Sequence, residues 1–213
     1  MRNNLPVRSR SGSIVPFMGT SRAVKYLSSI ELVTLEQAWQ KARDTALRPK
    51  QFGRYGLVFL LLRHTGARLT EVFGIDDTRD VDFRNAEIRL VTLKQRTKKG
   101  SLPTRIVPVP PWVTNEIAAY LVQYPEMKGR VFKLKKQNFW VRFRAIALEA
   151  GIPEDLAHPH VLRHTRAIEL LRAGIPVTIV QDLLGHSSLT TTAVYLRMSG
   201  AEAKAVLKER GII

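Results

Sequence analysis

The sequence predicts one α+β domain that is mostly α-helical, with a small three-stranded antiparallel sheet at one edge. Through most of the chain, apolar residues recur three and four positions apart, as they do along one face of an amphipathic helix. Residues 80–109 differ, because apolar and polar residues alternate there in short β-rich runs. A chain of 213 residues is also long enough for one domain with a sizeable core.

The first core helix is predicted to begin at Thr34, because Gln37 follows at the spacing of a capping box. Its buried stripe is formed by Leu35, Ala38, Trp39 and Ala42. A second and more apolar helix, from Gly56 to His64, is predicted to lie near the centre of the core. Gly66 is its expected C-terminal cap.

Arg68 lies just after this cap, at the entry to a short helix that contains Leu69, Val72 and Phe73. An arginine between two apolar helices costs free energy unless it has a charged partner or a ligand. Glu71, three residues further on, is one such partner. The residues alone therefore support either a structural ion pair or a functional arginine with Glu71 in support.

The predicted sheet consists of an alternating stretch around Val81 and Phe83, a β-rich run from Glu87 to Leu93, and a matching run from Arg105 to Val109. Residues 94–101, between the last two runs, form a strongly basic turn. Most of its lysines are interpreted as solvated charges that protect the sheet edge.

The next helix is predicted to start at Pro111, with its buried face formed by Ile117, Tyr120 and Leu121. Residues 128–144 contain seven basic residues and no acidic ones. Trp140, Phe143 and Ala147 form a helical stripe, which predicts that the two aromatic rings lie in the core. The basic side chains should then lie on the outer face, where they can contact phosphates. Later helix boundaries are expected at Gly151, Gly174, Pro176 and Gly185.

The charge of the chain indicates a polyanionic partner. Lys and Arg number 34 against 18 Asp and Glu, a formal net charge of +16. Nucleic acid is the first candidate and an anionic membrane the second. No apolar run approaches the length of a transmembrane span, so no membrane-spanning segment is expected, and nucleic acid is preferred to a membrane as the partner. The absence of Cys excludes a disulfide framework, a Cys-based zinc finger and a Cys nucleophile, and fits an intracellular protein.

Candidate catalytic groups lie in the last third of the chain. His160 and Arg163 are three residues apart, on one face of a predicted helix. His186 follows a helix-ending Leu-Leu-Gly, and Tyr195 comes nine residues later. Positive and proton-handling groups followed by a hydroxyl nucleophile suit attack on a phosphodiester, because a phosphoryl group in transfer carries spread negative charge.

Four motifs resemble those of one known family. His160–Thr165 (HVLRHT), Leu184–Ser188 (LGHSS) and Thr190–Tyr195 (TTTAVY) resemble the C-terminal signature of the tyrosine recombinases, the phage integrase family. Thr65–Val72 (TGARLTEV) resembles the family's first arginine box. One such motif would be a weak signal, but all four occur in the family's order and close to its spacing. The resemblance implies the tyrosine recombinase catalytic-domain fold.

The resemblance also implies a site-specific DNA recombinase in which Tyr195 becomes joined to a DNA 3′ phosphate, with no cofactor and no metal. Arg68 and Arg163 present planar, permanently charged forks that would hold the two non-bridging oxygens of the scissile phosphate. His160 would accept the proton of Tyr195. His186 would donate a hydrogen bond to the phosphate or the nucleophile.

Family members carry a catalytic lysine in the hairpin that corresponds to the basic turn. Folding this hairpin symmetrically about residues 98–100 puts Lys94 at the end of the entering strand, where it would protonate the leaving 5′ oxygen. Lys98 is the alternative, because many family members have a Thr-Lys pair there.

Residues 1–22 are polar and basic and are interpreted as a disordered arm, either without a role or able to touch the DNA backbone. Residues 23–213 would form the catalytic domain. A separate N-terminal clamping domain, which most members carry, is not expected, so the chain resembles short catalytic-domain-only members. The resemblance implies double-stranded DNA as partner, a tetramer on DNA formed through residues 201–210, and a cytoplasmic, nucleoid-associated location.

Three alternatives remain at this stage. A non-catalytic or degenerate DNA-binding protein derived from a recombinase would have the same charge and motifs. A type IB topoisomerase makes the same attack but reseals the strand alone, and the Leu-Gly-His motif favours a recombinase. A zinc hydrolase using His158, His160 and His164 would lack any acidic residue within that run.

Overall fold

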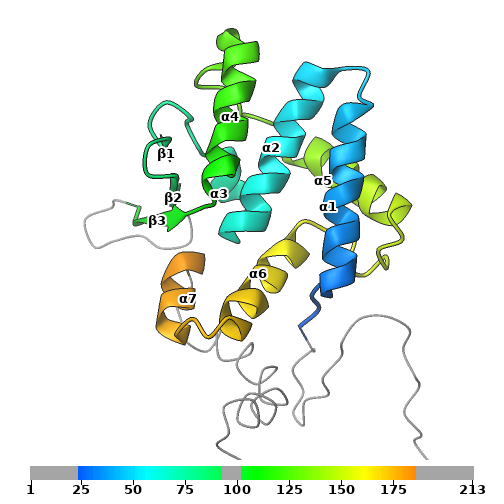
Figure 1. Ribbon diagram of the computed structural model, residues 1–213, viewed down its shortest axis with the longest axis vertical. Helices are drawn as coiled ribbons and strands as arrows, with labels where there is room; N and C mark the ends of the chain where they lie inside the picture. The colour runs from blue at the N-terminus through cyan, green and yellow to red at the C-terminus, as the bar shows by residue number, and fades with distance from the viewer. Residues whose placement is uncertain (1–23, 93–101, 186–213) are drawn as a thin grey trace, which may run out of the picture.

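The computed structural model describes residues 24–92 and 102–185, and the predicted fold class is confirmed within them. Figure 1 shows a group of helices with a small sheet at one side, and α6 and α7 at the lower end. The elements, in chain order, are α1 (Ser29–Asp44), α2 (Pro49–Thr65), α3 (Leu69–Phe73), β1 (Val81–Asp82), β2 (Glu87–Val91), β3 (Thr104–Pro108), α4 (Pro111–Gln123), the 3₁₀ helix η1 (Pro125–Met127), α5 (Lys136–Glu149), α6 (His160–Arg172) and α7 (Val177–Leu184).

Helix α1 begins earlier than predicted. The hydroxyl of its N-cap, Ser28, accepts a hydrogen bond from the backbone N–H of Glu31, whose carboxylate accepts one from the backbone N–H of Ser28. Thr34 lies inside the helix and donates to the carbonyl of Ile30. The prediction was wrong because Ser28 and Glu31 have the same capping-box spacing, and the earlier start also buries Leu32.

The main core lies where α1, α2 and α5 meet. Trp39 of α1 stacks on Phe59 of α2 and on Phe139 of α5, with ring centroids 4.8 Å and 5.8 Å away. Offset stacking of this kind adds to the free energy gained by burying the rings. Helix α2 starts before the predicted Gly56, but it ends as expected, because Gly66 adopts the left-handed conformation with φ of +63°.

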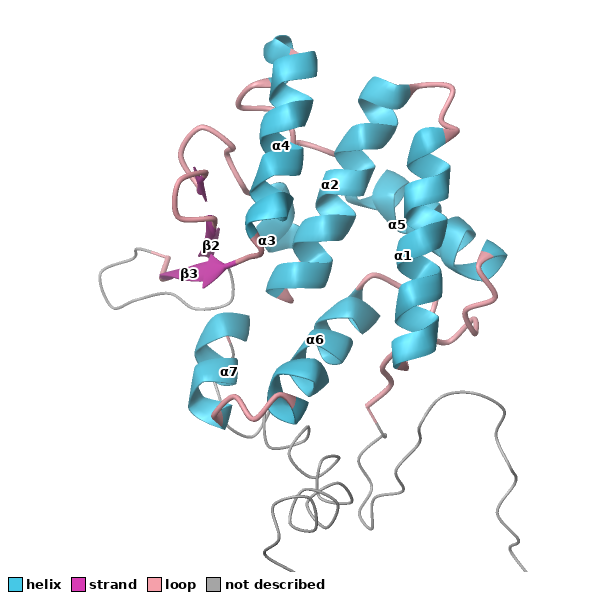
Figure 2. Ribbon diagram, viewed as in Figure 1, coloured by secondary structure: helices cyan, strands magenta, loops and turns pink. Residues whose placement is uncertain are grey.

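The sheet has the three antiparallel strands that the alternating pattern predicted, in the order β1-β2-β3 (Figure 2). Its register pairs Ile88 with Val107 and Leu90 with Arg105. Ile88, Leu90 and Val107 are buried in the core. Because directly paired residues point to the same face of a sheet, Arg105 is the charged residue on the inward face.

Helix α4 starts at Pro111 as predicted, but the predicted stripe of α5 is partly wrong. Phe139 and Phe143 are fully buried, whereas Trp140 is only partly buried, and the guanidinium of Arg144 lies 5.6 Å from its ring centroid. Both Phe139 and Trp140 are at a helical spacing from Phe143, so the pattern alone allows either ring to be on the buried stripe. Packing against Trp39 decides between them.

Helix α6 ends, and α7 begins and ends, where glycine and proline predicted. Gly174 follows α6, Pro176 precedes α7, and Gly185 ends α7 in the left-handed conformation. Helix α6 packs against α2, and α7 packs against α6 and β3. Within the described ranges, none of the helices has the length and apolarity to span a membrane.

Candidate active site

The turn between α2 and α3 carries Arg68 and is held from two directions. The backbone N–H of Arg68 donates to Glu71 Oε2 (2.9 Å), which fixes the start of α3. A Cβ added to Gly66 would lie 2.5 Å from Leu184, so the backbone of the turn packs closely against the end of α7. The site is therefore built where α2, α3 and α7 meet.

The side chain of Arg68 is partly exposed, at 20%. Its Nη1 donates to Glu71 Oε1 at 2.9 Å, and both Nη atoms lie 3.3 Å from the carbonyl oxygen of Gly185. The predicted Arg68–Glu71 pair is present. The structure adds a contact to the end of α7 that the sequence did not indicate.

Glu71 is shared by two arginines. Its side chain is fully buried, and Arg105 Nη2 donates to its Oε2 at 2.7 Å while Arg68 binds its Oε1. Burial by itself raises the pKa of Glu71, but the hydrogen bonds and charges of Arg105 and Arg68 outweigh it, so the pKa lies below its usual value. The carboxylate is therefore charged, and it meets two positive charges.

Arg105 was not recognised as a site residue from the sequence, where it was assigned only to the third strand. Its Nε donates to the carbonyl of Leu183 (2.8 Å), and its Nη1 donates to Thr92 Oγ1 (3.0 Å). The available signal was its position. A basic residue that alternates in phase with the buried Val107 must lie on the inward face, where a charge needs partners.

Arg163 reaches the same turn from α6. It is buried, with 2% of its surface exposed, and its Nη1 donates to the carbonyl of Gly66 at 2.8 Å. Arg68 follows Gly66 by two positions. The structure therefore brings together, around one turn, the two arginines that the sequence nominated from motifs almost a hundred residues apart.

His160 is the first residue of α6 and is exposed. Its ring makes an edge-to-face contact with His164, with centroids 4.6 Å apart. His160 and Arg163 lie on the same helix, as predicted, one turn apart. His158 is half-buried, and burial lowers its pKa.

The other predicted site residues, Lys94, Lys98, His186 and Tyr195, lie outside the described ranges, as do residues 1–22 and 201–210. Their neighbours in sequence are described. Thr92 accepts a hydrogen bond from Arg105, and the carbonyl of Gly185 accepts from Arg68. Among residues 24–92 and 102–185, no group of three or more His, Asp and Glu side chains is placed to hold a metal ion.

Comparisons with known proteins agree with the motifs and the fold. The model of the "Phage integrase family" matches residues 26–202. Tyrosine recombinase XerA of Thermococcus kodakarensis is 32% identical over 168 residues, covering 72% of this chain and 56% of the relative. The chain thus spans about half the length of the curated relatives it matches.

Two solved structures show the same fold. A crystal structure of XerA recombinase superposes with a TM-score of 0.68 at 25% identity, covering 92% of this chain and 66% of the other. XerH recombinase, in a pre-cleavage complex with its difH substrate, gives 0.64 at 22% identity, covering 84% and 52%. Since the family match covers most of the 213 residues and the fold agrees, the chain belongs to the phage integrase family and has the fold of its tyrosine recombinase catalytic domains.

Proposed function

We propose that this chain is the catalytic domain of a site-specific DNA recombinase, which cleaves and rejoins DNA strands through a covalent 3′-phosphotyrosyl intermediate. One observation carries the proposal. Arg68 and Arg105 share the single buried carboxylate of Glu71, and Arg163 is anchored to the same turn. The positive charges exceed the negative charge there, which is the arrangement that a phosphate dianion or a phosphodiester requires.

The proposed chemistry starts with Tyr195. Its oxygen attacks the phosphorus, the bond from phosphorus to the 5′ oxygen breaks, and the tyrosine becomes linked to the 3′ phosphate. His160 accepts the phenolic proton, and Lys94, or Lys98 in its place, gives a proton to the leaving 5′ oxygen. A 5′ hydroxyl from a partner strand then attacks the phosphotyrosine by the reverse route and restores a phosphodiester. His186 donates a hydrogen bond during both steps.

Arg68 and Arg163 hold the phosphate oxygens in this proposal. Their forks can bind both non-bridging oxygens, and the interaction strengthens as negative charge becomes concentrated in the five-coordinate transition state. Loss of one such clamp should slow cleavage by roughly 10²–10⁴-fold. Part of the Arg68 side chain is exposed to reach a phosphate, while Glu71 fixes its direction.

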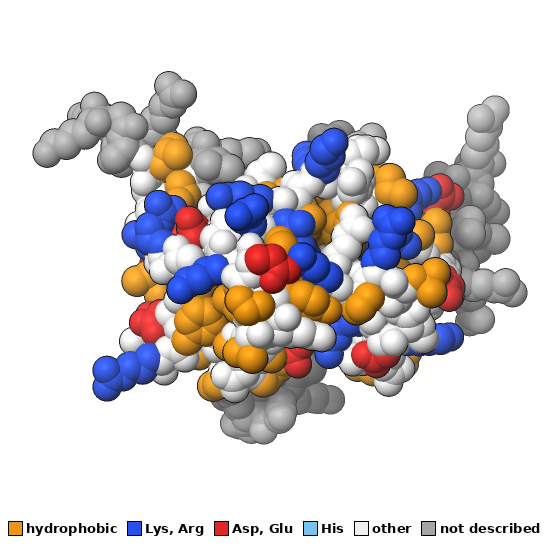
Figure 3. Space-filling model, turned by 90° about the horizontal axis from the view of Figure 1, so that it is seen from above, with side chains coloured by type: hydrophobic (Ala, Val, Ile, Leu, Met, Phe, Trp, Pro, Cys, Tyr) orange, Lys and Arg blue, Asp and Glu red, His pale blue; other side chains and the backbone are white. Residues whose placement is uncertain are grey.

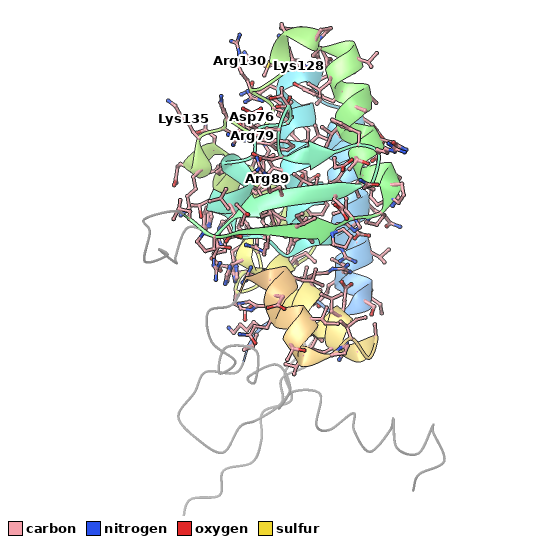
Figure 4. All side chains as sticks on the ribbon, turned by 90° about the vertical axis from the view of Figure 1, so that its left-hand side faces the viewer. Asp76, Arg79, Arg89, Lys128, Arg130 and Lys135 are labelled. Atoms are coloured by element: carbon pink, nitrogen blue, oxygen red, sulfur yellow. The ribbon has the colours of Figure 1, made fainter. Side chains whose placement is uncertain are left out.

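DNA would pass over the basic loop between η1 and α5. Lys128, Arg130 and Lys135 are exposed on this loop, beside the sheet (Figure 4). Arg54 of α2 fixes the loop by donating to the carbonyls of Arg130, Val131 and Lys133 at 2.7–2.8 Å. Because these hydrogen bonds fix the loop backbone, its lysines and arginines stay in place to contact a phosphate backbone.

The distribution of charge and the relatives support DNA as the partner. Figure 3 shows Lys and Arg side chains spread over one face of the molecule, with fewer acidic side chains between them. XerH recombinase was solved bound to its difH substrate, and the Tn1549 transposon integrase, which has a similar fold, was solved in complex with transposon right end DNA. Assembly on DNA as a tetramer, with residues 201–210 docked on a neighbouring subunit, is part of the same proposal.

The test is covalent trapping on a nicked duplex from which cleavage releases a short fragment, so that religation cannot occur. Duplexes would come from DNA that flanks the gene, and the protein and its Tyr195→Phe variant would be compared on a denaturing gel with EDTA present. A covalent band for the unaltered protein alone is expected. A band that persists in Tyr195→Phe would overturn the assignment of the nucleophile. DNA binding without any band over the whole set of duplexes would favour the non-catalytic alternative.

A further inference from the structure

Arg105 of β3 contacts three separate parts of the candidate site. Its Nη2 donates to Glu71 Oε2 at 2.7 Å, beside Arg68. Its Nε donates to the carbonyl of Leu183 in the last turn of α7 (2.8 Å), and its Nη1 donates to Thr92 Oγ1 just after β2 (3.0 Å). With 10% of the side chain exposed and each guanidinium nitrogen engaged, Arg105 holds its neighbours together instead of reaching outward.

We propose that Arg105 is a positioning residue for DNA cleavage, which holds Arg68 in place through Glu71 and holds the end of α7 through Leu183. This inference rests on the proposed function, because it assigns Arg105 a role in that same site. His186 directly follows Gly185 in the sequence. Fixing the end of α7 therefore also fixes the residue from which the chain continues to His186.

The sharing of one carboxylate explains why Arg68 needs Arg105. Arg105 lies 2.7 Å from Glu71 Oε2 and 3.3 Å from Oε1. The guanidinium of Arg68 binds only Oε1, at 2.9 Å, because Oε2 accepts from the backbone N–H of Arg68. Without Arg105, both oxygens could turn to Arg68 and form a bidentate pair, the strongest geometry for these groups. Such a pair would neutralise Arg68 and draw it away from a phosphate. Arg105 thus keeps positive charge on Arg68 available.

The contact with α7 is close and uses the chemistry of a helix end. A Cβ on Gly185 would lie 2.6 Å from Arg105 Nη1, so a larger residue would displace the guanidinium. The last carbonyls of a helix lack intrahelical partners and carry the negative end of its dipole, so a cationic donor stabilises them. Arg105 binds the carbonyl of Leu183, and Arg68 binds that of Gly185. Both arginines therefore hold the same helix end.

Arg63 of α2 offers a matched control. Its side chain is 12% exposed, close to the 10% of Arg105. Its Nε donates to Glu36 at 2.6 Å, and its Nη atoms donate to Glu169 at 2.7 and 2.8 Å. Losing Arg63 therefore removes a comparable set of charged hydrogen bonds, in a cluster that does not include Arg68 or the end of α7.

The test compares Arg105→Gln, Arg105→Lys and Arg63→Gln with the unaltered protein. Single-turnover cleavage of the nicked duplex at saturating protein measures the chemical step, and binding of the same duplex measures affinity separately. Arg105→Gln should cleave about 100-fold more slowly at nearly unchanged affinity, because a misplaced clamp loses transition-state contacts. Arg105→Lys keeps the charge without the planar fork and should recover part of the rate. Arg63→Gln should cleave within about threefold of the unaltered protein.

Hydrogen exchange gives a second readout that does not require activity. At a temperature where the variants are folded, amides of residues 66–73 and 183–185 should exchange faster in the Arg105 variants than in the unaltered protein. Arg63→Gln should leave both segments unchanged. If Arg105→Gln does not fold, Arg105→Lys gives the same comparison with a smaller expected effect.

Equal losses of cleavage in the Arg63 and Arg105 variants would mean that the effect is one of stability, and would overturn the proposal. Unchanged exchange at both segments in the Arg105 variants would overturn it as well. A failure of the unaltered protein to form any covalent product would count against the proposed function instead. In that case the exchange measurement alone still decides whether Arg105 holds Arg68 and the end of α7.

Discussion

Two clusters of buried and half-buried charges lie near the C-terminal end of α2, and their charge balance differs. The first, called here the balanced cluster, consists of Arg63, Arg166, Glu36 and Glu169, whose formal charges cancel. The second, called here the site cluster, consists of Arg68, Arg105 and Glu71, with one more positive than negative charge. Arg163 is anchored beside the site cluster through the carbonyl of Gly66.

The difference in formal charge suggests a way to distinguish a cluster that only joins helices from one that can bind an anion. Burying an unbalanced set of charges costs free energy, so a cluster that only joins helices is best kept neutral. An excess of positive charge at the site cluster is stabilised when an anion binds. We therefore propose the end of α7 and the α2–α3 turn as the functional side. The buried carboxylate of Asp80 is also shared by two arginines, but Arg79 and Arg89 are 63% and 40% exposed, so solvent screens their charge.

Removing an arginine from the site cluster should give the largest effect on activity. Arg68→Gln should lower single-turnover cleavage by roughly 10²–10⁴-fold, because a phosphate clamp is lost in the transition state. Its thermal stability should change little, since the surplus of positive charge falls. Normal cleavage by this variant would leave Arg68 with only a structural ion pair and would remove the distinction between the clusters.

Neutralising Glu71 should give the largest effect on stability. Glu71→Gln leaves Arg68 and Arg105 facing each other without their buried counter-charge, and should lower the free energy of unfolding by about 3 kcal/mol. Urea denaturation with an unchanged m-value would measure the loss. A loss below about 1 kcal/mol, the range of surface pairs, would show that solvent already screens the two arginines.

The balanced cluster should make stability depend on pH through its neighbour His64. Burial, followed by the charges of Arg63 and Arg166, lowers the pKa of His64 from 6.5 to about 4. Between these values the unfolded chain binds the proton and the folded chain does not. The contribution is therefore fully present above about pH 6.5 and is lost as the pH falls toward 4.

Because His64 is partly exposed, the loss should be on the order of 1 kcal/mol after allowance for solvent screening. Denaturation curves of the unaltered protein and of His64→Gln between pH 7 and pH 4.5 would measure it. The variant should lose less stability over this window. Parallel curves would show that His64 stays neutral or becomes charged equally in both states.

The smallest effect is expected for Glu36→Gln in the balanced cluster. Glu36 is 38% exposed, so its pair with Arg63 should contribute about 0.5 kcal/mol. Arg63 also keeps its two hydrogen bonds to Glu169. A loss as large as that in Glu71→Gln would show that the two clusters are equally sensitive and that charge balance does not distinguish them.

Several features could be predicted from the sequence because they depend on local chemistry. Gly66, Gly174 and Gly185 end helices, and Pro111 and Pro176 begin them, as short-range backbone conformation requires. Alternation identified the three strands. The motifs nominated Arg68, His160 and Arg163 as site residues, and the fold places both arginines at the turn after α2.

Other features were decided only when the elements packed together. The choice of Phe139 over Trp140 as the buried ring depends on which rotation of α5 best fills the core. The role of Arg105 depends on the register that turns it inward, toward Glu71 and Leu183. The sequence determined the helix ends that glycine and proline mark and the identity of the chemical groups, because these follow from neighbouring residues. Tertiary structure decided which charges meet, because the partners of Arg105 come from α3 and α7 and are set by long-range packing.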